Sequence, residues 1–416
     1  MIIEKKVFMK LQLLKALGLM ALILSGCSKC SRKETTVNST TQTSVKKSLP
    51  DILGTTHTAG NYYLTDKDYL NEGADQVLAM GSHVIKVWFY GKRNEHPEVM
   101  YPFNSNWPKA NSLVDGAKLP YFKTLFNKPF TTYILVVTSL GRSADYWRDG
   151  ITKEQEKDEQ RQFYELAKHF LTTYKDSGKT FVLQHWEGDW MTRGHFNLDE
   201  DPRPEALANM VIWLNARQAG VNQAKKEIGQ HGVRVYSAAE VNRVVSSMQT
   251  GRPNIVNKVL PYTNVDLVSY SSWDSCVDHY NDPNVLRSAL DFIAANVPDS
   301  PDFGSKNVYL GEFGLPENEF SPERVQQTMA NVVDVGLAWG CPYIVYWELY
   351  CNELKPDKQT TPGELPTYQS DLIPRTPLAA VHNNNAVRGF WLIKPDGTKS
   401  VVWDYFHRLL TASSKK

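Results

Sequence analysis

Eight short apolar segments recur along the chain from Asp51 onward, and amphipathic helical stretches separate them. Segments that are apolar throughout are typical of strands buried on both faces, as in a parallel sheet. The predicted strands cover residues 52–57, 84–89, 131–137, 180–186, 233–239, 265–271, 307–311 and 342–347. Eight strand–helix units with none left over predict an α/β fold, a (β/α)8 TIM barrel formed by residues 51–416.

Two doubly wound domains of four strands each are the alternative for a chain of 416 residues. No linker-like change of composition appears near the middle of the chain, which favours one barrel. Hydrophobic residues make up 42% of the sequence, enough to bury a sizeable core. The net charge of +1 gives no basic excess, so we expect no nucleic-acid partner, and we expect a monomer.

Several helix starts and one hairpin can be predicted from short polar motifs. Asp66, Asp201 and Ser321 are residue types common just before a helix, and Pro follows the last two. We expect a final helix over residues 400–410. A small hairpin is expected over residues 390–400, around Pro395-Asp396-Gly397.

The first 26 residues are typical of a signal peptide, with early lysines and a short apolar run over residues 16–24. That run ends in Leu24-Ser25-Gly26-Cys27, which resembles the lipobox of bacterial lipoproteins. The resemblance implies a lipid on Cys27 and a location at the bacterial cell envelope, on the periplasmic face or the cell surface. Residues 27–50, rich in Ser, Thr and Lys, then form a flexible tether. A signal peptide cut elsewhere, with Cys27 incidental, is the alternative.

The remaining cysteines and the missing motifs limit other chemistry. Cys276 and Cys351 can form a pair, or each can be a free buried thiol. No two histidines have the spacing of a helical zinc site, and no phosphate-binding or nucleophile-elbow motif is present. We therefore expect neither a metal nor a cofactor.

Two glutamates stand out where predicted strands end. Glu187 directly follows the fourth strand, and Glu312 directly follows the seventh. Chemistry in such barrels takes place at the carboxyl ends of the strands. Strands four and seven lie across the barrel from each other, so these carboxyl groups can flank one bound sugar. Glycoside hydrolysis requires such a pair, an acid for the leaving oxygen and a carboxylate near the anomeric carbon.

The sequence Gly311-Glu312-Phe313-Gly314, with a second Glu after strand four, resembles the clan A retaining glycoside hydrolases, which include the cellulase-like family five. The resemblance implies that Glu312 is the nucleophile and Glu187 the acid/base. It implies further that Trp347 stacks on the reacting sugar and that Tyr270 lies near the nucleophile. Two positions depart from the clan: Trp186 stands where Asn usually precedes the acid/base, and Lys86 where Arg is frequent.

Tryptophans gather at the same strand ends. Seven of the 11 Trp fall there or in the following loops, and aromatic rings bind the flat apolar faces of sugars. The predicted substrate-binding residues are Trp347, Tyr270, Trp186, Trp190, Trp273, Glu240, Asn242, Lys86, His57 and Glu348. Glu240 and His57 can instead be structural, and Glu348 can bond a neighbouring loop.

These features predict a retaining glycoside hydrolase that cleaves a β-linked poly- or oligosaccharide by double displacement. The alternative is a non-catalytic, lipid-anchored surface glycan-binding protein on the same scaffold. Both explain the tryptophans, and only the enzyme explains a Glu at each of the two strand ends.

Cys27 provides a direct test of the anchor. Metabolic labelling with a palmitate analogue should mark the wild-type protein. The Cys27→Ala variant should lose the mark and appear in the soluble fraction, because the thiol that carries lipid is gone. A label that persists in Cys27→Ala would rule out lipidation at this position.

Overall fold

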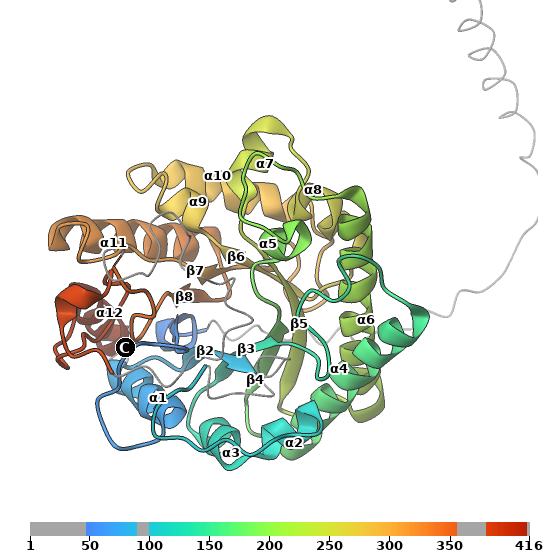
Figure 1. Ribbon diagram of the computed structural model, residues 1–416, viewed down its shortest axis with the longest axis horizontal. Coiled ribbons are helices and arrows are strands. Elements are labelled where there is room, and N and C mark those ends of the chain that lie inside the picture. Colours follow the sequence, from blue (N-terminus) through green and yellow to red (C-terminus); the bar gives the residue numbers. More distant parts are fainter. Residues whose placement is uncertain (1–46, 90–99, 356–379, 414–416) are drawn as a thin grey trace, which may run out of the picture. The chain divides into compact units, whose positions relative to one another are not determined.

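The computed structural model describes residues 47–89, 100–355 and 380–413. All eight strands are parallel and close into one barrel in chain order, with β1 hydrogen-bonded to both β2 and β8 (Figure 1). The strands are β1 (Leu53–Thr56), β2 (Val84–Phe89), β3 (Thr132–Val137), β4 (Thr180–Gln184), β5 (Arg234–Val241), β6 (Leu267–Ser271), β7 (Val308–Glu312) and β8 (Ile344–Tyr346). The predicted (β/α)8 barrel is confirmed, and the alternative of two four-stranded domains is wrong.

Strand β2 has its predicted bounds, whereas β4 ends at Gln184 and not at Trp186. Past Gln184 the backbone bonds side chains instead of a neighbouring strand. The Trp186 carbonyl accepts a hydrogen bond from the His185 ring at 2.7 Å, and the Glu187 amide donates to the Glu240 carboxylate at 3.0 Å. These side-chain bonds take the place of ladder bonds for the Trp186 carbonyl and the Glu187 amide.

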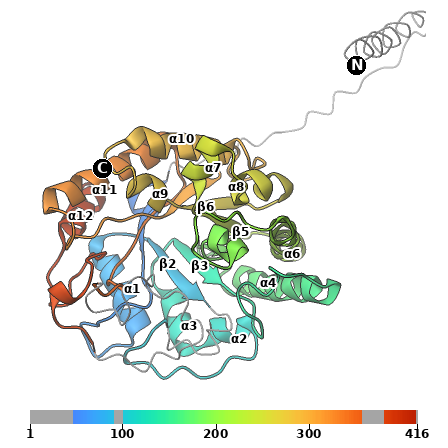
Figure 2. The same cartoon turned by 45° about the horizontal axis from the view of Figure 1, so that its top comes forward.

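Helices surround the strands in Figures 1 and 2. They are α1 (Tyr69–Met80), α2 (Leu113–Lys118), α3 (Pro120–Asn127), α4 (Lys153–Thr173), α5 (Gly188–Arg193), α6 (Pro204–Ile228), α7 (Val244–Thr250), α8 (Ile255–Lys258), α9 (Trp273–Cys276), α10 (Pro283–Ala294), α11 (Pro322–Trp339) and α12 (Val401–Ser413). The short helices α5, α7, α8 and α9 lie in the connections after β4, β5 and β6. The sequence did not predict these four.

Two of the three predicted helix starts need correction. Helix α1 follows Asp68, whose side chain accepts from the Asn71 amide, and not Asp66. Helix α6 begins at Pro204, after Arg203 and not after Asp201, and the Asp201 carboxylate instead bonds the Arg252 guanidinium at 2.7 Å. Helix α11 follows Ser321 as predicted.

Two groups of apolar side chains pack on opposite faces of the strands. The larger one lies between the strands and the helices. The smaller one comprises Val84, Ile134, Val182, Tyr236, Ala238, Leu267, Tyr309, Tyr343 and Val345, with residues from seven strands or their immediate flanks. Side chains alternate along a strand, so Lys86, Gln184, Glu240 and Ser269, each two residues beyond a member of the smaller group, lie on the same face. That face is the barrel interior, and these four form a buried polar layer above its apolar part.

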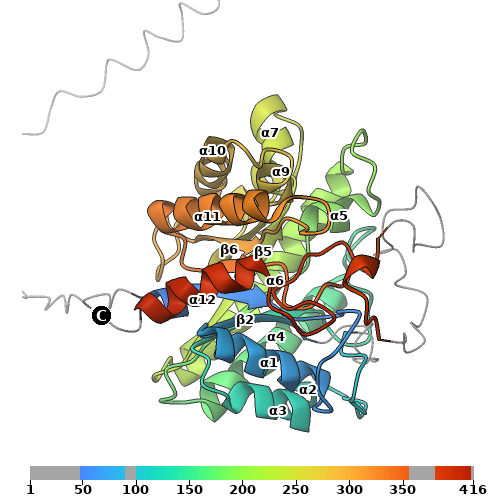
Figure 3. The ribbon, with the colours of Figure 1, turned by 90° about the vertical axis from the view of Figure 1, so that its left-hand side faces the viewer.

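The compact unit begins at Lys47, a few residues before the predicted boundary at Asp51. A short 3-10 helix, Leu49–Asp51, buries Pro50, whose carbonyl accepts from the His83 amide at 2.8 Å. Helix α12 packs beside α1 and α11 (Figure 3). Residues 1–46, with Cys27, lie outside the described residues, so the signal peptide and the lipid anchor stay predictions.

The predicted hairpin is confirmed by an antiparallel bridge between Ile393 and Lys399. Cys276, Cys341 and Cys351 are buried free thiols, so the alternative of a Cys276–Cys351 disulfide is wrong. Within the described ranges, no helix combines the length and the apolar composition that crossing a bilayer requires.

Candidate active site

Glu312 reaches the barrel mouth through an irregularity in β7. Tyr270 pairs with Leu310, but the next residue, Ser271, pairs with Glu312, so Gly311 is an extra residue in the ladder. A Cβ at Gly311 would lie 1.8 Å from the Ser269 hydroxyl, so only glycine fits there. Such a bulge redirects the side chain that follows it. This steric limit explains why a glycine precedes Glu312 in the motif.

Lys86 on β2 lies wholly buried between two carboxylates. Its ammonium donates to Glu312 Oε1 at 2.7 Å, to Glu240 Oε2 at 3.0 Å and to the Gly311 carbonyl at 3.2 Å. An ammonium has three donors, and all three are used. Burial lowers the pKa of Lys86, but Glu240 and Glu312 raise it, and the net pKa lies above the usual value. Lys86 is therefore a fixed positive charge.

Glu240 on β5 is the centre of the polar layer. Its Oε2 accepts from Gln184 and Ser269, each at 2.7 Å, in addition to Lys86. Its Oε1 accepts from the Glu187 amide at 3.0 Å. Four donors thus occupy a carboxylate with no exposed surface. The structure supports the structural interpretation of Glu240 over the substrate-binding one, because its bonding capacity is spent inside the protein.

Glu187 is the N-cap residue of α5, directly before Gly188, and only 7% of its surface is exposed. The Ser271 hydroxyl contacts Glu187 Oε1 at 2.7 Å and Glu312 Oε2 at 3.0 Å. Glu187 Oε1 and Glu312 Oε2 can therefore be no farther apart than these two contacts laid end to end. The Trp273 indole N–H donates to the same Glu312 Oε2 at 3.3 Å.

The two glutamates differ in how strongly they hold a proton. Burial, and then the negative charge of Glu312, raise the pKa of Glu187 well above its usual value. Burial also raises the pKa of Glu312, but the Lys86 ammonium opposes that rise. Glu312 is therefore the first of the two to ionise, and Glu187 keeps its proton to higher pH.

Two predicted site residues lie behind the barrel wall. Tyr270 belongs to the core between strands and helices, and its hydroxyl donates to Asp274 at 2.6 Å. Side chains alternate along β6, so Ser271, and not Tyr270, faces the carboxylates. His57 is wholly buried, with its ring against Tyr69 and its Nε2 bonding the Tyr69 carbonyl at 2.8 Å. Both substrate-binding predictions are wrong for this reason.

Other predicted residues hold the loops of the mouth in place. The Asn242 side chain accepts from the Asp189 amide at 3.1 Å, and the Asn242 amide donates to the Asp189 carboxylate at 3.0 Å. Glu348 is wholly buried and accepts from the Asn352 amide at 2.9 Å, as its loop-bonding interpretation predicted. Asn242 thereby ties the end of β5 to the helix that begins after Glu187.

The tryptophans differ in how much surface they offer. Trp186, Trp190 and Trp273 are partly exposed, whereas Trp347 is 2% exposed. The Trp347 ring meets the edge of Trp88 at 5.8 Å between centroids. Trp88 follows Lys86 on the same face of β2, so this pair lies next to the polar layer. The role of Trp347 under a sugar stays a prediction.

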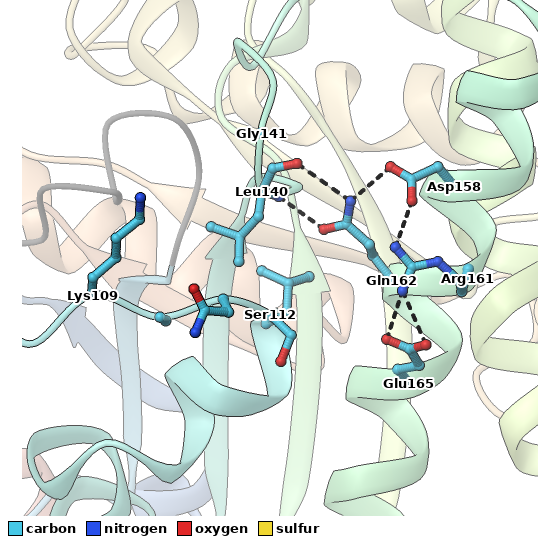
Figure 4. Close-up of a pocket in the computed structure, with 11 residues that line it drawn as sticks. Lys109, Ser112, Leu140, Gly141, Asp158, Arg161, Gln162 and Glu165 are labelled. Atoms are coloured by element: carbon cyan, nitrogen blue, oxygen red, sulfur yellow. Dashed lines mark hydrogen bonds and ion pairs between the residues drawn. The ribbon is translucent and has the colours of Figure 1, made fainter.

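A separate pocket of about 320 Å³ lies between α2, α4 and the loop after β3 (Figure 4). None of the predicted site residues lines it. The charged groups on its α4 side bond their own neighbours: Arg161 pairs with Asp158 and Glu165. Within the residues that the structure describes, no group of three or more His, Cys, Asp or Glu side chains has the arrangement of a metal site.

No protein-family model matches this sequence, and no curated protein matches it. Solved structures do match. GH5_18 from Streptomyces cattleya, in complex with GlcNAc, aligns with a TM-score of 0.54 at 10% identity, over 89% of this chain and 82% of that one. The chain has the fold of family-five glycoside hydrolases.

Two further structures agree. A variant of GH5_18 in complex with Manb1-4GlcNAc aligns with a TM-score of 0.53 at 11% identity, over 86% of this chain and 80% of that one. An exo-beta-1,4-mannosidase from Opitutaceae bacterium strain TAV5 aligns with a TM-score of 0.51 at 13% identity, over 88% of this chain. The alignment covers 60% of that mannosidase. At such identities the likeness establishes the fold, and function has to be argued from the site.

The buried cation gives a test that needs no substrate. Lys86→Met leaves two buried carboxylates without their counter-charge and should lower the free energy of unfolding by about 3–5 kcal/mol near pH 7. Burial raises the pKa of Glu312 and the Lys86 ammonium opposes that rise, so without the ammonium Glu312 holds its proton more strongly in the folded than in the unfolded chain. The deficit should therefore shrink as the pH falls to about 5. Urea unfolding at the two pH values measures it.

The matched control is Lys153→Met, which removes a lysine that is 80% exposed and should change stability little. Adding Glu240→Gln to Lys86→Met should restore part of the loss, because one buried charge is removed. A loss that is the same at both pH values, or no larger than that of Lys153→Met, would contradict the assignment of Lys86.

Proposed function

We propose that this chain is a retaining glycoside hydrolase with Glu312 as the nucleophile and Glu187 as the acid/base. The observation that carries the proposal is the single Ser271 hydroxyl in contact with both carboxyl groups, at 2.7 and 3.0 Å. Inverting enzymes separate their carboxyl groups by about 6.5–9.5 Å, to admit a water, and retaining enzymes by about 5–5.5 Å. Laid end to end, the two contacts place Glu187 Oε1 and Glu312 Oε2 closer together than the inverting range.

The first step uses the difference in proton affinity. Burial and the charge of Glu312 raise the pKa of Glu187 well above its usual value, so Glu187 is the group that holds the proton needed by the oxygen that leaves. Glu312 is the ionised member and attacks the anomeric carbon. Its bond to Lys86 and its contacts with Ser271 and Trp273 fix the direction of attack.

The second step reverses the proton transfer. Once Glu312 carries the sugar, its negative charge is gone, and the repulsion that raised the pKa of Glu187 disappears with it. Glu187, left ionised by the first step, can then take the proton of an incoming water. Glu240 has no part in either step, because its Oε2 accepts from Lys86, Gln184 and Ser269 and its Oε1 accepts from the Glu187 amide.

The substrate we propose is a β-linked poly- or oligosaccharide. Support comes from the partly exposed Trp186, Trp190 and Trp273 around the carboxylates. The structures of similar fold include one with bound Manb1-4GlcNAc and one described as an exo-beta-1,4-mannosidase. We propose further that the enzyme acts as a monomer, anchored through a lipid on Cys27 at the bacterial cell envelope.

A non-catalytic glycan-binding protein is the second candidate, and Trp186 is the observation that favours it. The clan usually has Asn before the acid/base, a residue that bonds the sugar 2-hydroxyl, and Trp cannot accept a hydrogen bond there. A broad panel of glycans separates the two candidates: the enzyme hydrolyses at least one, and the binding protein binds without hydrolysis.

Substitution of the two glutamates tests their roles on an aryl β-glycoside that the wild type cleaves. Glu312→Ala should lose at least roughly 10³-fold in turnover, because no other group can attack. Glu187→Ala should still release the aryl group and then stall as a glycosyl-enzyme. Azide needs no general base, so it should restore turnover of Glu187→Ala and yield a β-glycosyl azide. The alkaline limb of the pH profile, which reports the acid, should disappear with Glu187.

Glu165→Ala on the outside of α4, where the side chain is 38% exposed, is the matched control and should behave as the wild type. Azide rescue of Glu240→Ala in place of Glu187→Ala would assign the acid to β5 and overturn the proposal. Normal glycan binding by both variants, with no hydrolysis by the wild type, would establish the binding protein instead.

A further inference from the structure

Three arginines line one shallow pocket on the β5 side of the barrel mouth. Arg193 ends α5, Arg243 follows β5, and Arg252 follows α7. The other lining residues are Leu198, Ser246, Ser247, Pro253 and Asn254. No carboxylate is among these lining residues. Arg193 lies in the connection after β4, and Arg243 and Arg252 lie in the connection after β5, so the pocket joins connections that follow two neighbouring strands.

The arginines differ in what their guanidinium groups already bond. Arg252 donates from each of its three guanidinium nitrogens, to the Asp201 carboxylate and to the carbonyls of Leu198 and Asp199. Arg193 donates from Nε and Nη1 to the carbonyls of Glu200 and Asp189. Its Nη2 makes no hydrogen bond within the described residues. In the part of the chain that the structure describes, the Arg243 guanidinium has no hydrogen bond and no ion pair. Its donors are therefore available to a ligand.

Three guanidinium groups lie close together at this pocket, and the Asp201 carboxylate pairs with one of them, Arg252. Burial lowers the pKa of Arg193, Asp189 and Asp201 raise it, and the neighbouring cations Arg243 and Arg252 lower it. The Asp189 carboxylate accepts the backbone amides of Asn242, Arg243 and Ile255. Within the described residues it accepts no hydrogen bond from the three guanidinium groups, so their remaining N–H donors are not used by it. A concave, partly desolvated site with surplus guanidinium donors favours an oxyanion.

Helix α5 connects this pocket to Glu187, the proposed acid/base. Glu187 begins α5, and Arg193 ends it. Trp190 lies in α5 together with Arg193. The Arg193 and Arg243 guanidinium groups lie 5.8 and 5.7 Å from the centre of the Trp190 ring. Trp190 is partly exposed. An aromatic ring flanked by two guanidinium groups can contact the apolar face of a sugar while the cations bond its charged substituent.

We propose that this pocket binds an oxyanion carried by the saccharide, a uronate carboxylate or a sulfate ester, on the side of the bond that Glu187 protonates. The substrate is thus an acidic glycan with its charge in the departing part. This inference rests on the proposed function for the direction of cleavage. Arg243 supplies the free guanidinium, Arg193 its remaining N–H donors, and Ser246 a hydroxyl in the pocket wall.

The test compares binding of matched oligosaccharide pairs to the full chain carrying Glu312→Gln, which prevents consumption of the ligand. One arm pairs glucuronate-containing oligosaccharides with their carboxyl-reduced forms, and a second pairs sulfated with desulfated ones. Titration calorimetry should show tighter binding of the acidic member in one arm, and that arm identifies the oxyanion. Adding Arg243→Gln should weaken this binding roughly 10- to 100-fold.

Two further variants separate a specific contact from general charge. Arg287→Gln removes an exposed arginine from α10 and should leave the preference unchanged. Arg243→Lys keeps the charge but loses the planar fork and should weaken binding by an intermediate factor. The preference for the acidic member should also decline as salt increases.

The inference is overturned if both members of every pair bind alike, including the case in which none binds, or if Arg243→Gln and Arg287→Gln have equal effects. The proposed function is judged separately, by hydrolysis. Cleavage of a neutral β-glycan without any acidic preference removes the inference and keeps the enzyme. An acidic preference that depends on Arg243 in a protein with no hydrolytic activity keeps the pocket and removes the enzyme.

Discussion

The Lys86 ammonium, buried between Glu240 and Glu312, is the interaction on which the rest of the site depends. Three carboxyl groups meet in the barrel mouth with one cation among them. One positive charge can offset only part of that negative charge in a desolvated site, so one carboxyl group has to stay protonated. The group without a contact to Lys86 is Glu187. In the proposed mechanism, contact with Lys86 is therefore what distinguishes the nucleophile from the acid.

Lysine suits this place for a geometric reason. An ammonium is a compact charge with three donors, and here they go to two carboxylates and one carbonyl on two different strands. A guanidinium would present a wider planar fork, better matched to one carboxylate at a time. With Lys86, the chain couples Glu240, which fixes the Glu187 amide, to Glu312. Lys86, at a position where the clan frequently has Arg, therefore suits the arrangement of carboxylates around Glu240.

The sequence was sufficient for the barrel and for the two glutamates, because both depend on apolar segments and on what directly follows them. It was insufficient for the direction of individual side chains. Tyr270 and Ser271 are neighbours on β6 whose side chains point to opposite faces, and the sequence did not show which of them faces the barrel mouth. His57 lies just past the end of the short strand β1. The bulge at Gly311 and the early end of β4 come from contacts between segments far apart in the chain. Nothing in the sequence singled out Ser271, whose hydroxyl contacts both carboxyl groups.

The fold alone does not assign an activity, since one barrel supports many reactions. Trapping the covalent intermediate tests the central claim most directly. A panel of 2-deoxy-2-fluoro β-glycosides with activated leaving groups slows both steps by destabilising the oxocarbenium-like transition state, and the good leaving group keeps the first step the faster one. Mass spectrometry of the digested protein should find the sugar on the peptide that contains Glu312. A sugar on Glu187 or Glu240, or turnover of the parent glycoside without any covalent adduct, would contradict the account.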